Sequence, residues 1–275
     1  MRPSSPAIDL VELDRDHPGF RDRAYRARRN AIARVALEYR GGPVPPVEYV
    51  DAEHEVWRRV WARLDPLHRA HACHEYLGAS ADLALDRTRV PQLAELNPRL
   101  EAATGFRMLP VAGLVSACTF LGHLGERVFL STQYIRHASA PFYTPEPDVV
   151  HEVVGHAATL IHPGIAGLSH LLGRAALVAD EAGVQALERV YWYTLEFGAV
   201  EQDGAPRAFG AGLLSSAGEL ERLVSGGAEL LPWDLERIAA TGYDPTDYQP
   251  RYFLAPSFAR LVADVGGWAR ARFGV

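Results

Sequence analysis

Two histidines five residues apart are the first feature of this sequence that suggests chemistry. His151 and His156 stand in the segment HEVVGH, which resembles the HExxH motif of zinc proteases with one additional residue. On an α-helix, residues advance by about 100°, so a spacing of four keeps two rings on one face and a spacing of five turns the second ring away. Gly155 could still allow both rings to reach one metal. In the left-handed conformation it would end the helix and let His156 turn back toward a shared metal. The pair alone is equally open to a purely structural interpretation.

A carboxylate farther along the chain strengthens the metal hypothesis. Glu196 lies in VYWYTLEFG, an otherwise aromatic and apolar segment with helical spacing. A lone glutamate in such surroundings is costly to bury unless a cation pairs with it. Two histidines and one carboxylate are the facial triad of non-haem iron(II) oxygenases, which leaves positions open for dioxygen and water. The alternative is a glutamate on the solvent face of the helix.

A second group of possible ligands lies near the first third of the chain. His68, His71 and His74 follow one another at i, i+3 and i+6, with Cys73 beside them. They could bind zinc, but no carboxylate or second ligand pair stands nearby in the sequence. A partly buried, hydrogen-bonded helix end is therefore the favoured interpretation.

Two other motifs also favour structural interpretations. The segment GAGLLSS at 210–216 lacks the third glycine and the preceding strand of a phosphate-binding loop. The arginine-rich stretch 21–29 is interspersed with Asp22 and Tyr25, which indicates a solvated helix face.

Helical patterns dominate the elements that must position these residues. Residues 106–137 mix short β-type runs with glycine turns, which predicts small strands and loops. The remaining pattern predicts one mainly α domain with a few short β-strands. Helices are expected at 20–39, at 52–64, at 68–77 after a break or restart at Pro66, at 90–100, at 151–156, at 165–179, at 181–200, after the loop 210–220, at 233–240 and at 257–273.

The composition excludes several classes of protein. With 275 residues, 48% apolar and 23% charged, the chain is an ordinary folded soluble protein. A formal net charge of −6 argues against a general nucleic-acid binder. No apolar run reaches the roughly 18 residues of a membrane span, and the first residues lack the apolar core of a secretory signal. Two cysteines cannot form a disulfide framework, so we expect a cytoplasmic protein.

Several long motifs, in order, resemble the tetrahydropterin-dependent aromatic amino acid hydroxylases. They are TQYIRHASAPFYTPEPDVVHEVVGH, YWYTLEFG, FGAGLLSSAGEL and YQPRYFLAPSF, preceded by YRARRNAIA, VEYVDAEHEVWRRV, HACHEYL, VPQL and TGFRMLPVAGLVSACTFL. The resemblance covers nearly the whole chain from about His17. It implies the catalytic-domain fold of that family as a single domain over 15–275, after a flexible tail at 1–14. Without a regulatory domain or a tetramerisation helix, the chain is similar to the compact bacterial form of the family, which implies a monomer.

The resemblance also implies roles for individual residues. His151, His156 and Glu196 would bind iron(II), Arg136 would bind the substrate's carboxylate with Asp148 orienting it, and Glu219 would support the ligands near Ser215. A planar guanidinium suits a carboxylate, which it can bind through two charge-assisted hydrogen bonds. Further residues implied for the amino-acid pocket are Thr144, Trp192 and Ser215. Those implied for the tetrahydropterin site are Gly113, Leu114, Val115, Phe120, Glu152 and Tyr191, with Phe120 stacked on the pterin ring.

The implied reaction is hydroxylation of the ring of a free aromatic L-amino acid, with iron(II), tetrahydrobiopterin or a related pterin as cofactors and O₂ as co-substrate. Trp192 and the lack of an acidic residue at the third place of Tyr243-Asp244-Pro245 favour phenylalanine as substrate, converted to tyrosine. Phe142 resembles the tryptophan enzymes, so tryptophan hydroxylation or attack at the meta position of phenylalanine are the alternatives. Leu130 and Ala117, in the pterin region, differ from the residues common in the family at these positions. The sequence that follows His156 differs from the family pattern as well. Outside the family, a zinc hydrolase with Glu152 as base and a non-enzymatic binding protein on the same scaffold stay open.

Overall fold

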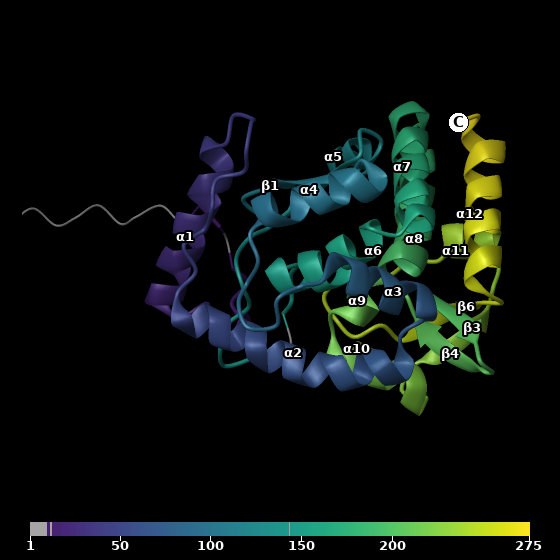
Figure 1. The fold of residues 1–275 in the computed structure, drawn as a ribbon. Coiled ribbons are helices and arrows are strands. Elements are labelled where there is room, and N and C mark those ends of the chain that lie inside the picture. Colours follow the sequence, from purple (N-terminus) through teal and green to yellow (C-terminus); the bar gives the residue numbers. More distant parts are fainter. Residues whose placement is uncertain (1–9, 12, 143) are drawn as a thin grey trace, which may run out of the picture.

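The structure is a computed structural model that describes residues 10, 11, 13–142 and 144–275. Most of the expected N-terminal tail, 1–14, lies outside the described residues. Where the chain is described, the backbone N–H groups of Leu10 and Val11 both donate to the side-chain oxygen of Asn30 on the first helix. Helices far outnumber strands in these residues, which confirms the mainly α prediction (Figure 1).

Four helices form the N-terminal part of the described chain. The first begins after Asp22, whose carboxylate accepts the backbone N–H groups of Ala24 and Tyr25. The four helices are α1 (Arg23–Glu38), α2 (Asp51–His71), α3 (His74–Leu83) and α4 (Leu93–Thr104). In Figure 1, α2 runs along the lower edge of the molecule from α1 toward the sheet.

The predicted break at Pro66 is wrong, because α2 continues through this residue to His71. A proline inside a helix removes one backbone hydrogen bond and costs about 3 kcal/mol. A continuous buried stripe offsets that cost: Trp61, Leu64 and His68 lie at helical spacing on both sides of Pro66 and are at most 4% exposed. Burial across the proline therefore decides the length of the helix.

The segment predicted as small strands and loops contains a helix as well. Strands β1 (Arg107–Pro110) and β2 (Val128–Ser131) pair in parallel, as a two-stranded sheet. Between them lies α5 (Ala117–Leu124), which the prediction missed. Ser116 begins this helix, since its hydroxyl oxygen accepts the backbone N–H of Thr119.

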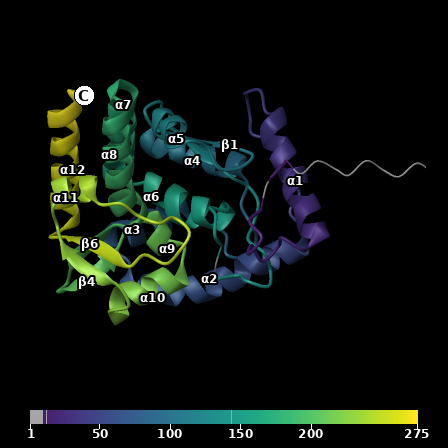
Figure 2. The same cartoon turned by 180° about the vertical axis from the view of Figure 1, so that it is seen from behind.

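The centre of the molecule is a run of helical segments. They are η1, a π-helix (His151–Ala157), α6 (Ala158–Leu160), α7 (Pro163–Val178), α8 (Glu181–Tyr191) and η2, a second π-helix (Trp192–Glu196). In Figures 1 and 2, α7 and α8 stand beside the final helix, α12 (Phe258–Phe273), at one end of the molecule.

A four-stranded sheet in the last third of the chain was not predicted. Its strand order is β4-β3-β6-β5; β3 is antiparallel to β4 and parallel to β6, and β5 is parallel to β6. The strands are β3 (Ala199–Gln202), β4 (Ala205–Ala208), β5 (Glu229–Pro232) and β6 (Arg251–Ala255). The helices between them are α9 (Ala211–Leu214), α10 (Ala217–Ser225) and α11 (Leu235–Ala240). Strands of four or five residues are too short to show an alternating pattern.

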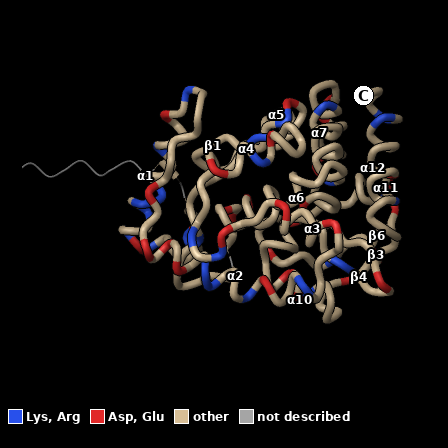
Figure 3. Tube along the Cα trace, in the orientation of Figure 1, with Lys and Arg blue, Asp and Glu red and all other residues tan. Residues whose placement is uncertain are grey.

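One large hydrophobic core joins side chains from helices and strands along the described chain. Trp57, Tyr193 and Phe253, from three distant segments, are almost completely buried in it. Arginines make up nearly all charged residues of α1, whereas charged residues of both signs follow one another along α2 (Figure 3). In the described residues, no helix combines the length and the apolar character that crossing a bilayer requires.

Candidate metal centre and adjoining pocket

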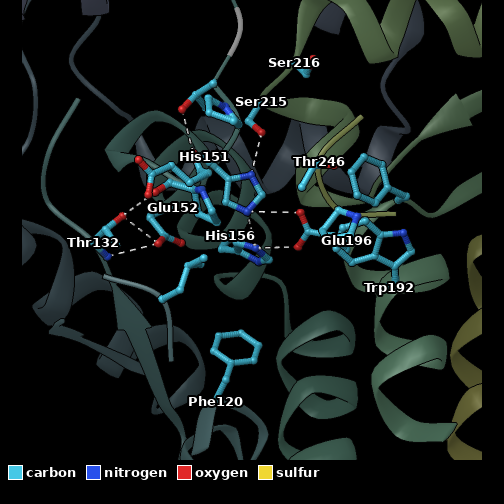
Figure 4. Close-up of a pocket in the computed structure, with 18 of the residues that line it drawn as sticks. Phe120, Thr132, His151, Glu152, His156, Trp192, Glu196, Ser215, Ser216 and Thr246 are labelled. Atoms are coloured by element: carbon cyan, nitrogen blue, oxygen red, sulfur yellow. Dashed lines mark hydrogen bonds and ion pairs between the residues drawn. The ribbon is translucent and has the colours of Figure 1, made fainter. Parts of the chain in front are cut away.

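Three side chains from two distant segments converge at the centre of the molecule (Figure 4). The Nε2 atoms of His151 and His156 are 3.0 Å apart. Oε1 of Glu196 lies 3.2 Å from Nε2 of His151, and its Oε2 lies 3.0 Å from Nε2 of His156. Three mutually cis ligands with metal bonds of about 2.1 Å stand about 3.0 Å apart. The donor set therefore fits one divalent metal ion with a facial triad of ligands.

Both segments that carry these residues are π-helices, and this explains the five-residue spacing. A π-helix closes its hydrogen bonds from i to i+5, so residues five apart lie on the same face. In η1 the N–H of Ala158 donates to the carbonyl of Val153, and in η2 the N–H of Phe197 donates to the carbonyl of Trp192 at 2.7 Å. The expectation that Gly155 ends the helix in the left-handed conformation is wrong, because Gly155 lies inside η1.

Glycines serve close packing around the triad. A Cβ atom on Gly155 would lie 2.7 Å from the carbonyl oxygen of Ala211, and one on Gly212 would lie 2.9 Å from Oε1 of Glu196. Such contacts are too short for real side chains, so α9 can lie against both π-helices only because these positions have no side chain. The glycine-rich segment 210–216 is thus a packing element of the metal centre.

Burial and hydrogen bonding leave the two histidine rings neutral and able to bind a metal. Burial lowers the pKa of His151 to about 4 and that of His156 to about 3, so both rings are neutral at pH 7. The hydroxyl of Ser215 donates to the carbonyl of Ala211 at 2.8 Å, so its oxygen accepts from Nδ1 of His151 at 3.0 Å. Nε2 of His151 then carries a lone pair, directed at the centre of the triad.

Two carboxylates compete for the third ligand position. An oxygen of Glu152 lies within 4.8 Å of the donor nitrogens of both histidines. However, Oε1 of Glu152 accepts the N–H of Thr132 at 3.1 Å and its hydroxyl at 3.0 Å, and burial raises the pKa of Glu152 to about 8. Glu196 lies closer to both nitrogens, and burial raises its pKa as well, which a cation would counteract. The geometry favours Glu196 as the ligand and places Glu152 in the pocket wall.

A cavity of about 420 Å³ opens beside the triad. It brings together nearly all residues that the sequence analysis singled out. They are His151, His156, Glu196, Arg136, Thr144, Trp192, Ser215, Gly113, Leu114, Val115, Phe120, Glu152, Tyr191 and Glu219. The departures from the family, Leu130 and Ala117, line the same cavity, as does Phe142.

Asp148 does not line the cavity but lies behind Arg136. The carboxylate is fully buried and accepts Nε and Nη2 of Arg136 at 2.9 and 2.7 Å, as well as the backbone N–H at 2.7 Å. Burial alone would raise the pKa of Asp148, but its bonds to Arg136 lower it below the usual value. This pairing fixes the plane of the guanidinium and leaves its outer N–H groups, on Nη1 and Nη2, for another carboxylate.

Trp192 and Tyr243 form an aromatic wall of the pocket, and two of the residues that hold this wall were missed from the sequence. The indole N–H of Trp192 donates to the side-chain oxygen of Gln249 at 3.0 Å, and Gln249 is 1% exposed. Tyr243 stacks on Trp192, and its hydroxyl donates to Glu188, which also lines the cavity. Glu188 lies one helical turn before Trp192, and this i, i+4 spacing was the signal available in the sequence.

The side-chain oxygens of Glu219 bond to residues that hold the aromatic wall. Its Oε1 accepts the backbone N–H of Gln249 at 2.9 Å, and its Oε2 accepts the hydroxyl of Tyr252. Gln249 in turn binds Trp192. In the described residues, no hydrogen bond joins Glu219 to the triad or to Ser215, so the expected support of the ligands by Glu219 stays a prediction.

The aromatic residues of the expected pterin site lie on the other side of the triad. Phe120 packs edge to face on Phe129 and on Tyr191, with ring centroids 5.4 Å apart in both pairs. Leu114 is 75% exposed at the mouth of the cavity. Phe120 also lines the cavity, and Figure 4 shows its side chain pointing toward the triad.

The arginine-rich helix face is not uniformly solvated. Arg29 is 1% exposed; its guanidinium lies 3.2 Å from the centroid of the Tyr134 ring and donates to Glu146 at 2.9 Å. Glu146 lines the cavity, between Thr144 and Asp148. The solvated interpretation is wrong for Arg29, because α1 packs against this loop, a contact between segments far apart in the sequence.

The rival histidine cluster is not a metal site. His68 is buried and hydrogen-bonded within the protein, whereas His74 is exposed and pairs with Asp203. Among the described residues, the group of potential ligands that converges contains His151, Glu152 and His156. The hydrogen-bonded interpretation is confirmed for His68.

Comparisons with known proteins agree with this geometry. Residues 8–272 match the model of the family described as biopterin-dependent aromatic amino acid hydroxylase. The chain is 45% identical over 253 residues to phenylalanine-4-hydroxylase of Homo sapiens and 45% identical over 253 residues to tyrosine 3-monooxygenase of Mus musculus. Both alignments cover 90% of this chain but only 56% and 51% of those proteins, so it spans about half the length of the curated relatives.

Solved structures are similar over most of the chain. The phenylalanine hydroxylase of Chromobacterium violaceum with bound iron(III) and oxidised 7,8-dihydrobiopterin superposes with a TM-score of 0.78 at 32% identity, covering 88% of this chain and 91% of that one. The cobalt-bound form of that protein has a TM-score of 0.77 at 33% identity, covering 84% and 87%.

Proposed function

This chain belongs to the biopterin-dependent aromatic amino acid hydroxylases, and from that premise we propose that it is an iron(II)- and tetrahydropterin-dependent monooxygenase of a free aromatic L-amino acid. The observation that carries the proposal is the convergence of His151, His156 and Glu196 within 3.0–3.2 Å beside a cavity that also holds Arg136. When bound, iron(II) supplies the site of O₂ activation and the tetrahydropterin supplies electrons.

The residues of the chain position the reactants and exclude water. Arg136 binds the substrate's carboxylate through its outer N–H groups, while Asp148 prevents the guanidinium from turning. Trp192, whose indole N–H is hydrogen-bonded to Gln249, forms the wall of the pocket against which the aromatic ring of the substrate lies. Phe120, which lines the cavity, stacks on the pterin ring. Fixed geometry of this kind lowers the entropic part of the barrier.

The proposed reaction is conversion of L-phenylalanine to L-tyrosine. Pro245 lines the cavity at the place where an acidic residue would favour tyrosine, and the wall around it is aromatic. The relatives named phenylalanine-4-hydroxylase and the phenylalanine hydroxylase structures support the same choice. Tryptophan hydroxylation and attack at the meta position are the alternatives that product analysis distinguishes.

The test is an anaerobic load of the purified protein with iron(II), followed by tetrahydrobiopterin, one aromatic amino acid and air. We expect para-tyrosine from phenylalanine, identified by chromatography and mass. Glu196→Ala should retain no stoichiometric iron and give no product, while Glu201→Ala, an exposed glutamate on the following strand, should match the wild type. Iron retained by Glu196→Ala, or no amino-acid-dependent pterin oxidation by the wild type, would overturn the proposal. Zinc in the protein as purified, with hydrolysis dependent on Glu152, would support a metallohydrolase instead.

We further propose that residues 15–275 act as one catalytic domain, as a monomer in the cytoplasm and without nucleic-acid or membrane partners. The net charge of −6 and two unpaired cysteines, Cys73 and Cys118, support this proposal. Light scattering of the purified protein tests the oligomeric state, and fractionation of the source cells tests the location.

A further inference from the structure

Two buried side chains outside the pocket hold the backbone of both segments that position His151. Tyr76, on α3, is completely buried, and its hydroxyl donates to the carbonyl of Val154 at 3.1 Å. His68, on α2, is 4% exposed, and its Nε2 lies 2.6 Å from the carbonyl of Leu214. Neither residue lines the cavity.

These two carbonyls lie beside the metal centre. Val154 is inside η1, between His151 and His156. Leu214 immediately precedes Ser215, whose oxygen accepts Nδ1 of His151. One contact therefore acts on the helix that bears both histidines, and the other acts on the residue that orients the first of them.

The hydrogen positions follow from the partners. A carbonyl only accepts, so the Nε2 of His68 must carry the proton that it shares with Leu214. Its Nδ1 is then an acceptor, 3.4 Å from the hydroxyl of Tyr76, and the two rings pack edge to face with centroids 5.0 Å apart. Since the single hydroxyl proton of Tyr76 goes to Val154, none is left for Nδ1 of His68, so the two side chains touch through their rings and each holds its own carbonyl.

The local elements need such support. A π-helix has poorer hydrogen-bond geometry than an α-helix and occurs mostly as single turns, and α9 has only four residues. The backbone bonds of these two elements therefore hold them less firmly than those of a long α-helix would. Gly155 lets the two elements touch, but this contact adds no directional bond.

We propose that Tyr76 and His68 are positioning residues of the metal centre, which act through the carbonyls of Val154 and Leu214 to fix His151 for metal binding. The inference rests on the proposed metal triad. Hydrogen bonds made directly to metal ligands typically change metal affinity by about 10- to 100-fold when removed, and Tyr76 and His68 act one bond farther from the metal. Tyr76 and His68 would thus determine how tightly and in which geometry the metal is held, beyond any contribution to the fold.

Cobalt(II) is a suitable probe, because its visible absorption reports ligand number and geometry. The metal-free full chain is titrated with cobalt(II), with the dissociation constant, the absorption bands and the thermal midpoint of the metal-free protein measured for each variant. Tyr76→Phe removes one oxygen atom, and His68→Leu removes the donor to Leu214. His68→Gln keeps an N–H at similar reach. Tyr39→Phe is the matched control, because Tyr39 also donates to a backbone carbonyl, that of Gly42, on an exposed loop.

We expect Tyr76→Phe and His68→Leu to weaken cobalt(II) binding several-fold, up to about tenfold, and to change the absorption bands. His68→Gln should restore most of the affinity, and Tyr39→Phe should match the wild type. Wild-type affinity and bands in Tyr76→Phe would overturn the inference even if its thermal midpoint falls, and this variant decides if His68→Leu does not fold. Loss of binding in Glu196→Ala with no effect in Tyr76→Phe would refute this inference alone. Wild-type binding in Glu196→Ala would refute the proposed triad and this inference together.

Discussion

Tyr243 lies flat on Trp192, with ring centroids 4.0 Å apart and ring planes inclined by 11°. The hydroxyl of Tyr243 donates to Oε1 of Glu188 at 2.5 Å, and Glu188 belongs to the same helical run as Trp192. The loop that carries Tyr243 is thus tied back to the helix whose tryptophan it covers. The aromatic wall of the pocket is consequently one assembly of two segments.

Removing the acceptor should loosen this wall. We predict that Glu188→Ala raises the KM for the amino acid roughly fivefold with a smaller change in kcat, because a net hydrogen bond contributes about 1 kcal/mol. Tyr243→Phe should have the same effect, and the double variant should be no worse than either single one. Steady-state kinetics on all three check this, with Glu181→Ala, an exposed residue at the start of the same helix, as control. Additive effects would mean that the two residues act separately.

Arg136→Ala should affect both substrate binding and stability. The loss of charge-assisted bonds of roughly 1.5–3 kcal/mol predicts a KM raised by about 10-fold or more. Asp148 would also stay buried without its partner, which costs about 3–5 kcal/mol. Adding Asp148→Asn to Arg136→Ala removes the unpaired charge, so it should recover part of the urea stability but not the KM. An unchanged KM in Arg136→Ala would show that the substrate's carboxylate binds elsewhere.

A methyl group at position 212 should disturb the metal centre. Because the added Cβ would lie 2.9 Å from Oε1 of Glu196, we predict that Gly212→Ala weakens cobalt(II) binding and lowers the thermal midpoint. The matched control is Gly167→Ala, on α7, where an added Cβ meets nothing within 4 Å. That substitution should be neutral or stabilise the protein by about 0.4–1 kcal/mol. Equal behaviour of the two variants would contradict the packing role of the glycine.

The metal-free protein should lose stability in mild acid. Burial lowers the pKa of His68 to about 4, below its ordinary value of 6.5, so between these values the unfolded chain binds more protons. The stability from neutral His68 is complete above about pH 6.5 and declines as the pH falls toward about 4. His151 and His156 act in the same direction, whereas Glu152, with its raised pKa, acts in the opposite one.

Comparing the wild type with His68→Gln isolates the contribution of His68 to the pH dependence of stability. Urea unfolding of metal-free wild type and His68→Gln across this pH range should show a shallower acid decline for the variant. The difference in slope should approach 1.4 kcal/mol per pH unit, the value of about one proton. Parallel curves for the two proteins would show that His68 is not kept neutral by burial.

The sequence allowed the long helices and the members of the site to be predicted, but not the way the site is built. Helices with a continuous apolar stripe, such as α1 and α12, lie close to their predicted bounds. The π-helices could not be foreseen from a period of 3.6 residues, and Gly155 was therefore given the wrong role. Contacts between distant segments also stayed hidden, as for Arg29 against Glu146 and for Glu219 against Gln249.

The wide turn of η1 has a consequence for how such a site can arise. It accommodates one residue more than an α-helical turn while the chain continues as a helix into α6. Deleting a single codon between His151 and His156 would give the protease-like spacing, and an α-helical turn could then replace the wide one while the later residues of the helix keep their orientation. The smallest genetic step between the two motifs therefore changes a single helical turn and leaves the packing of the later residues in place.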